Sequence, residues 1–181
     1  MHIWTQALMA LLTLAYPALI YFGLGHFEPR YLALLLASLA LVRAIATRDR
    51  VWLAAAAGAA VLGMVALVAN EALPLKLYPA LVNAVMLLVF GSSLKFGPPV
   101  VERLARLREG NLPPHAIAYT RTVTQIWCLF FVVNGSLALW TALAATVEVW
   151  ALYNGLLAYL LMGLLFAVEW LVRQRVRARH G

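Results

Sequence analysis

The chain has 181 residues, of which 65% are hydrophobic and only 12% are charged. Soluble domains carry about 25% charged residues, so this composition excludes a soluble fold and indicates a single integral membrane domain over residues 1–181. The net charge of +7 does not indicate nucleic-acid binding, because the basic residues lie at the ends of apolar runs and not on one folded face.

Six apolar segments approach or reach the roughly 20 residues that a membrane-spanning helix needs. They cover residues 3–25, 31–46, 51–69, 75–94, 124–145 and 149–172. The first is too long for the apolar part of a signal peptide, so we expect it to be a span. The link between the last two is very short and requires an antiparallel hairpin. We therefore predict an all-α fold, a polytopic bundle of six transmembrane helices.

Lysine and arginine gather on alternate connections of this bundle, as the positive-inside rule requires of cytoplasmic segments. The basic residues on these connections are Arg43, Arg48, Arg50, Lys95, Arg103, Arg106, Arg108, Arg121, Arg173, Arg175, Arg177 and Arg179. Only Arg30 and Lys76 fall on the other side. The distribution predicts that both termini lie in the cytoplasm.

The longest polar interval, "GPPVVERLARLREGNLPPH", joins the fourth and fifth predicted spans. Prolines favour the first turn of a helix and Gly110 its end, so we expect a helix over about residues 99–109. Val100, Leu104 and Leu107 would share one side, opposite Glu102, Arg103, Arg106 and Glu109. Such a short amphipathic helix is predicted to lie in the headgroup plane on the cytoplasmic side. The proline-containing "NLPPH" ends it, and the next helix should run directly into the fifth span.

Basic residues of this interval and its flanks form a candidate docking surface. They are Lys95, Arg103, Arg106, Arg108 and Arg121. One interpretation is a strap whose arginines contact anionic lipid; the other is a docking site for an acidic cytoplasmic protein, such as an acyl carrier protein. Charge alone does not separate the two.

Three amides, Asn83, Asn134 and Asn154, fall within predicted spans, where polar groups normally face the bundle interior. They could line one polar cavity, or they could bond to one another and to backbone between helices. Near the cytoplasmic edge, Glu169 and Arg173 are spaced to form an ion pair.

No catalytic motif accompanies these residues. The four histidines are scattered, Cys128 is the single cysteine, and Asp49 is the single aspartate. Ser-elbow, phosphate-loop and paired-histidine patterns do not occur. We expect a protein that is not an enzyme and that uses no metal or cofactor.

The C-terminal half resembles a known family. The segments "YPALVNAVMLLVFGSSL", "PPVVERLARL", "YTRTVTQIWCLFFVVNGSLALWTAL" and "WALYNGLLAYLLMGLLFAVEWLVR", within about residues 77–173, carry the resemblance. They are similar to small predicted bacterial inner-membrane proteins found beside fatty-acid-synthase-like and aryl-polyene genes, sometimes labelled ketosynthase-related. More distantly, they resemble the intracellular septation protein A family. The ketosynthase label has no support in the chain, because Cys128 lies within a predicted span.

The resemblance implies an accessory or scaffold role in acyl-chain, polyene or envelope biogenesis in the bacterial inner membrane. Acyl carrier proteins, other envelope-assembly membrane proteins or further copies of the chain would then be partners. A small transporter or flippase for a lipid-like product, using an asparagine-lined cavity, is the alternative. The resemblance supplies no catalytic residues.

Overall fold

The computed structural model describes residues 16–24, 26–32, 34, 38 and 50–180, and within these ranges the chain is helical with no strand. The helices are α3 (Arg50–Ala69), α4 (Leu73–Lys76), α5 (Tyr78–Lys95), α6 (Val100–Glu109), α7 (Pro114–Ala144), α8 (Val147–Leu152), the π-helix η1 (Tyr153–Leu157) and α9 (Ala158–His180). Residues 16–24 are also helical. The predicted all-α class is confirmed for this part of the chain.

Three helical segments are long and apolar enough to cross a membrane: Leu73–Lys95, Pro114–Ala144 and Val147–Val176. They correspond to the fourth, fifth and sixth predicted spans, and the chain is a helical membrane protein. The third predicted span is α3, which carries a shorter apolar stretch, Ala60–Ala69. Most of the first two predicted spans lies outside the described residues.

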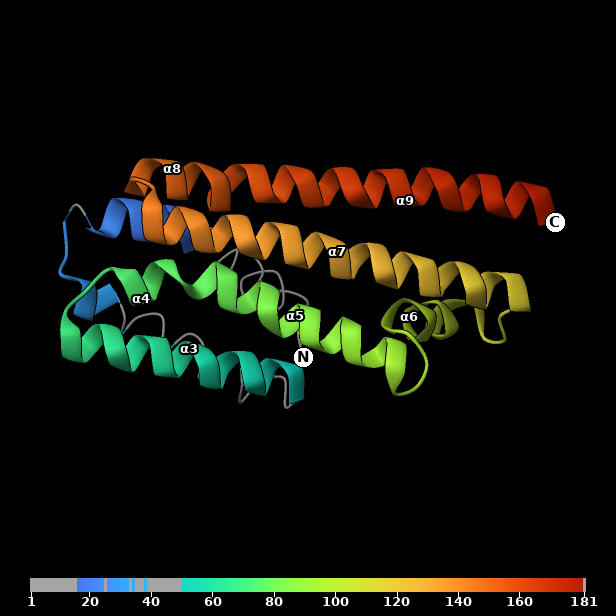
Figure 1. Cartoon of the computed structure of the whole chain (residues 1–181), viewed down its shortest axis with the longest axis horizontal. Coiled ribbons are helices and arrows are strands. Elements are labelled where there is room, and N and C mark those ends of the chain that lie inside the picture. Colours follow the sequence, from blue (N-terminus) through green and yellow to red (C-terminus); the bar gives the residue numbers. More distant parts are fainter. Residues whose placement is uncertain (1–15, 25, 33, 35–37, 39–49, 181) are drawn as a thin grey trace.

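The long helices α5, α7 and α9 lie side by side and alternate in direction (Figure 1). The central helix α7 packs against α5 through an aromatic cluster in which the rings of Phe90 and Phe131 are 5.1 Å apart. Trp127 extends the cluster to Phe166 on α9, at 4.6 Å between ring centroids. Large apolar side chains also cover the outside of the bundle, among them the exposed Leu88 and Leu129. An apolar exterior of this kind suits lipid as the surrounding solvent.

A proline breaks the fourth span near its start, and aromatic side chains donate hydrogen bonds to the backbone carbonyls left free there. Pro79 has no N–H to donate to the carbonyl of Leu75, four residues earlier. The Tyr16 hydroxyl donates to that carbonyl, and the Trp150 indole Nε1 donates to the carbonyl of Lys76 at 2.9 Å. Freed carbonyls need such donors because lipid offers none. The contacts join residues 16–24, α8 and the α4–α5 junction at one end of the bundle.

The amphipathic helix α6 lies across the opposite end. In Figure 1 it is seen nearly end-on beside the end of α5, whereas the long helices run across the view. It begins at Val100, with Pro99 as the N-cap and not inside the first turn. It ends at Glu109, and the C-cap that follows is Gly110, whose φ of 68° suits glycine. The next helix starts at Pro114 and continues into the fifth span, as predicted.

Candidate functional site

Two of the three predicted amides meet between α5 and α7. Asn134 Nδ2 donates to Asn83 Oδ1 at 3.0 Å, and the hydroxyl of Tyr153 in η1 donates to Asn134 Oδ1 at 2.8 Å. Asn83 Nδ2 in turn donates to the carbonyl of Pro79 at 2.8 Å. Gly135 makes this approach possible, since a Cβ at that position would lie 2.9 Å from the Cβ of Asn83. The network therefore ties three elements together at mid-bundle.

The third amide, Asn154, belongs to a different contact. Its Nδ2 donates to the Trp150 carbonyl at 2.9 Å and to Thr141 Oγ1 at 3.2 Å, which joins η1 to the end of α7. Both Asn154 and Thr141 are buried. Throughout the described residues, buried side-chain nitrogen and oxygen atoms all have hydrogen-bond partners. This geometry favours the structural interpretation of the amides over a shared polar path.

A groove of about 290 Å³ lies between α7 and α9. Its lining consists of Ile126, Leu129, Phe130, Val133, Asn134, Tyr153, Leu161 and Leu165. Of the three predicted amides, Asn134 is the one that contributes to this lining. The groove is therefore mainly hydrocarbon-lined, with one polar pair, Asn134 and Tyr153.

The basic residues predicted to form a docking surface have different roles at the α6 end of the bundle. Arg121 Nη2 donates to the Leu94 carbonyl at 3.0 Å, so it stabilises the C-terminal end of α5. Lys95 and Arg103 are exposed, and Lys95 Nζ lies 5.4 Å from the centre of the Phe96 ring. The Arg108 side chain lies outside the described part of the chain.

Helix α6 turns an unexpected side toward the protein. Glu102, predicted to lie on the solvent side, is only 5% exposed, and its Oε1 accepts from Arg106 Nε at 2.8 Å. The ion pair makes this burial tolerable, because each charge has its partner. Leu104 and Leu107 are instead 57% and 83% exposed. Arg103 and Arg106, predicted on one side, are thus divided between an exposed position and a half-buried one.

A serine that the sequence analysis did not single out fixes the start of α6. Pro99 offers no side-chain cap, and the backbone N–H of Val100 donates to Ser93 Oγ at 3.1 Å. The Ser93 hydroxyl donates to the Phe90 carbonyl at 2.7 Å, which keeps it on α5. The "SS" pair before the prolines was the available signal, but no local pattern distinguishes Ser93 from Ser92.

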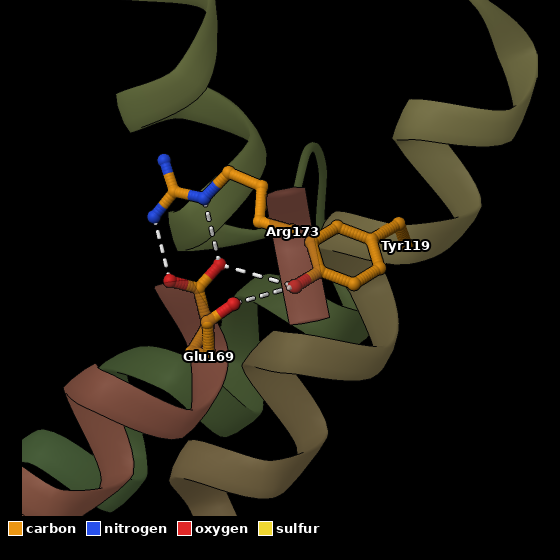
Figure 2. Close-up of polar contacts among 3 residues, drawn as sticks. All are labelled: Tyr119, Glu169 and Arg173. Atoms are coloured by element: carbon orange, nitrogen blue, oxygen red, sulfur yellow. Dashed lines mark hydrogen bonds and ion pairs between the residues drawn. The ribbon is translucent and has the colours of Figure 1, made fainter. Parts of the chain in front are cut away.

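The predicted Glu169–Arg173 ion pair is confirmed and has a third member (Figure 2). Arg173 Nη2 lies 2.6 Å from Glu169 Oε2, and its Nε donates to Oε1 at 3.0 Å. The Tyr119 hydroxyl donates to Glu169 Oε1 and to the Glu169 carbonyl, both at 3.2 Å. These bonds fasten the first part of α7 to the last part of α9. Within the described ranges, no three His, Cys, Asp or Glu residues are grouped to hold a metal ion.

Comparisons of the chain with protein-family models, with curated proteins and with solved structures give no match.

Proposed function

We propose that this chain is a non-enzymatic scaffold or accessory protein of the bacterial inner membrane that recruits an acidic cytoplasmic partner at its basic end. The basic end is the end of the bundle where α5 finishes, α6 lies crosswise and α9 finishes. The observation that carries the proposal is the exposure of Lys95 and Arg103 at this end. Exposed cations steer an acidic partner and fix its orientation.

The opposite end of the bundle has a different charge pattern. There Arg30 Nη2 is paired with Glu28 Oε2 at 2.7 Å, and Glu71 and Glu148 add negative charge. Under the positive-inside rule this polarity supports a cytoplasmic position for the basic end. The full proposal is six spans with both termini in the cytoplasm.

The placement of α6 supports an interfacial position for that helix. It lies crosswise at the end of α5 (Figure 1), and Leu104 and Leu107 face away from the protein. Leucines in that position are stabilised by the boundary between headgroups and acyl chains. In this arrangement Arg103 lies at headgroup level, where it can contact anionic lipid or a docked protein.

The partner proposed is acidic, and the resemblance described above favours an acyl carrier protein or an envelope-assembly membrane protein. The transport alternative receives less support, because Asn83 and Asn134 bond to each other while Asn154 bonds to Thr141 and to the Trp150 carbonyl. Self-association of the chain is compatible with a scaffold role.

Charge reversal tests the recruitment. The double variant Lys95→Glu/Arg103→Glu alters two exposed cations but leaves Arg106 and Arg121 with their structural bonds. We expect it to lose capture of the host's acyl carrier protein from detergent extracts. The control is Arg30→Glu/Lys76→Glu, which changes the net charge equally at the opposite end, removes the exposed Glu28–Arg30 ion pair there and should capture normally. Equal capture by both variants would contradict recruitment at the basic end.

A further inference from the structure

The groove between α7 and α9 is lined almost entirely by hydrocarbon side chains. On α7 its lining residues follow a single helix face, from Ile126 through Leu129 and Val133 to Asn134. Leu161 and Leu165 form the facing wall on α9. The volume of about 290 Å³ is close to the lower limit of small-molecule sites, about 300 Å³.

Both walls belong to segments long and apolar enough to cross a membrane, so the groove lies within the hydrocarbon region. The eight-residue step from Ile126 to Asn134 corresponds to about 12 Å along a helix. Half of a bilayer core is about 15 Å. The groove therefore extends through roughly the depth of one leaflet, from the side of the basic end to Asn134, near the middle of the predicted fifth span.

The apolar lining makes the groove a poor site for water. A buried water needs two to four polar partners, and along most of the groove the walls offer only carbon. The polar pair closes one end, where Tyr153 donates to Asn134 Oδ1 and Asn134 donates to Asn83. Because these groups bond among themselves, an apolar chain end can meet them without leaving a polar atom unpaired.

Contacts at both ends of the groove fix the spacing of its two walls, α7 and α9. At one end Trp150 is fully buried in α8, and the π-helix that follows presents Tyr153 to Asn134. At the other end, Tyr119 on α7 bonds to Glu169 on α9 (Figure 2). The spacing of α7 and α9 between these contacts is thus maintained by the protein. Single-turn π-helices of this kind frequently occur at functional sites.

We propose that this groove binds a single acyl chain, aligned with α7 between Ile126 and the Asn134–Tyr153 pair. The chain is that of a bilayer phospholipid, because both walls belong to segments long and apolar enough to cross the membrane, where phospholipid acyl chains form the surrounding hydrocarbon. The inference goes beyond partner recruitment and does not depend on it, because the groove residues are separate from Lys95 and Arg103.

Photolabelling of the full chain in nanodiscs tests this site. One arm uses a phospholipid with a diazirine in its acyl chain, and the other uses a free diazirine fatty acid. Peptide mapping by mass spectrometry should find the phospholipid label concentrated on Phe130 and Leu165, the half-buried apolar side chains of the lining. Labelling by the free fatty acid and not by the phospholipid would overturn the assignment to a phospholipid chain.

Two leucines of α9 supply a matched pair of variants. Leu161 lines the groove and is 44% exposed, whereas Leu164 is 61% exposed and outside the lining. Leu161→Trp should fill the groove and reduce labelling of Phe130 about tenfold, which corresponds to 1.4 kcal/mol of lost binding. Leu164→Trp should label as the wild type does. Val133→Trp with control Leu143→Trp repeats the test from the α7 wall if Leu161→Trp does not fold.

Three further results would overturn the proposal. Label spread evenly over outward leucines such as Leu88 and Leu164 would show ordinary bilayer contact only. Equal labelling of the Leu161→Trp and Leu164→Trp proteins would show that the groove is not the site. A wild-type groove that resists both probes while a photoreactive residue at position 161 crosslinks to a second copy would assign the groove to self-association.

Discussion

At the residue scale, the polar side chains of the spans join neighbouring helices through hydrogen bonds. Asn134 contacts both Asn83 and Tyr153, and Asn154 contacts Thr141. Each such bond in a bilayer contributes about 0.6 kcal/mol on average, with a maximum near 1.7 kcal/mol. Their value lies in specifying which helix faces meet, because dispersion forces alone favour many similar packings of leucine and alanine.

A double-mutant cycle should reveal the bond between the two amides. We expect Asn83→Ala and Asn134→Ala to be coupled by about 0.6 kcal/mol in unfolding free energy, measured by SDS titration in mixed micelles. The control cycle pairs Asn83→Ala with Asn154→Ala, whose side chains bond to different partners. Its coupling should be near zero, and similar values in both cycles would argue against the network.

Gly135 allows the same contact to form, and its substitution should be destabilising. A Cβ there would lie 2.9 Å from the Cβ of Asn83, so Gly135→Ala should cost about 1–3 kcal/mol through overpacking. A Cβ added to Gly163 on α9 would meet nothing within 4 Å, so Gly163→Ala should be neutral or stabilising by up to about 1 kcal/mol. Thermal unfolding midpoints of the two variants compare them directly, and equal midpoints would refute close packing at Gly135.

At the element scale, α6 is an amphipathic helix whose orientation depends on two side chains. Ser93 caps its first amide from α5, and Glu102 faces the bundle in an ion pair with Arg106. Together they leave Leu104 and Leu107 directed away from the protein. The helix thus combines an ionic contact toward the bundle with an apolar strip that needs lipid to cover it.

Removal of the cap should loosen α6. Ser93→Ala takes away the acceptor of the Val100 N–H and should raise the amide hydrogen-exchange rates of α6, with a loss of about 1 kcal/mol in local stability. The neighbouring Ser92 is exposed and donates to the Val89 carbonyl within α5, so Ser92→Ala serves as the control. If exchange in α6 is the same in both variants, Ser93 is not the cap.

The existence of α6 could be predicted from its sequence, but its rotation could not. The prolines before it and Gly110 after it predicted the helix. Helical periodicity separates an apolar side from a polar side, yet it does not say which side contacts the protein. The burial of Glu102 depends on the packing of α6 against α7 and on the ion pair with Arg106. The packing is a tertiary contact that helical periodicity does not reveal.

For the amides and the ends of the spans too, the sequence did not predict which side chains contact each other. Their position within apolar runs predicted that Asn83, Asn134 and Asn154 face the interior, but pairing across helices requires their relative depth and rotation. Residues 75–94 were predicted as one uninterrupted span, without the break at Pro79, and the side chains that donate to the freed carbonyls, Tyr16 and Trp150, are distant in sequence. No local pattern predicted the π-helix that places Tyr153 beside Asn134.

At the scale of the whole molecule, the charge polarity and the apolar exterior define a membrane protein with two unlike ends. One end carries α6, Lys95 and Arg103, and the other carries the Glu28–Arg30 pair. The long helices between them keep these ends apart (Figure 1). Recruitment of a cytoplasmic partner at the basic end requires that this end lies in the cytoplasm.

Thiol labelling of sealed spheroplasts tests this orientation most directly. In a Cys128→Ser background, cysteines replace Glu71 at one end and Asn111 in the α6–α7 connection, both exposed positions. A membrane-impermeant maleimide should label Glu71→Cys in sealed spheroplasts and Asn111→Cys only after lysis. Labelling of Asn111→Cys before lysis would place the basic end outside and contradict recruitment of a cytoplasmic partner there.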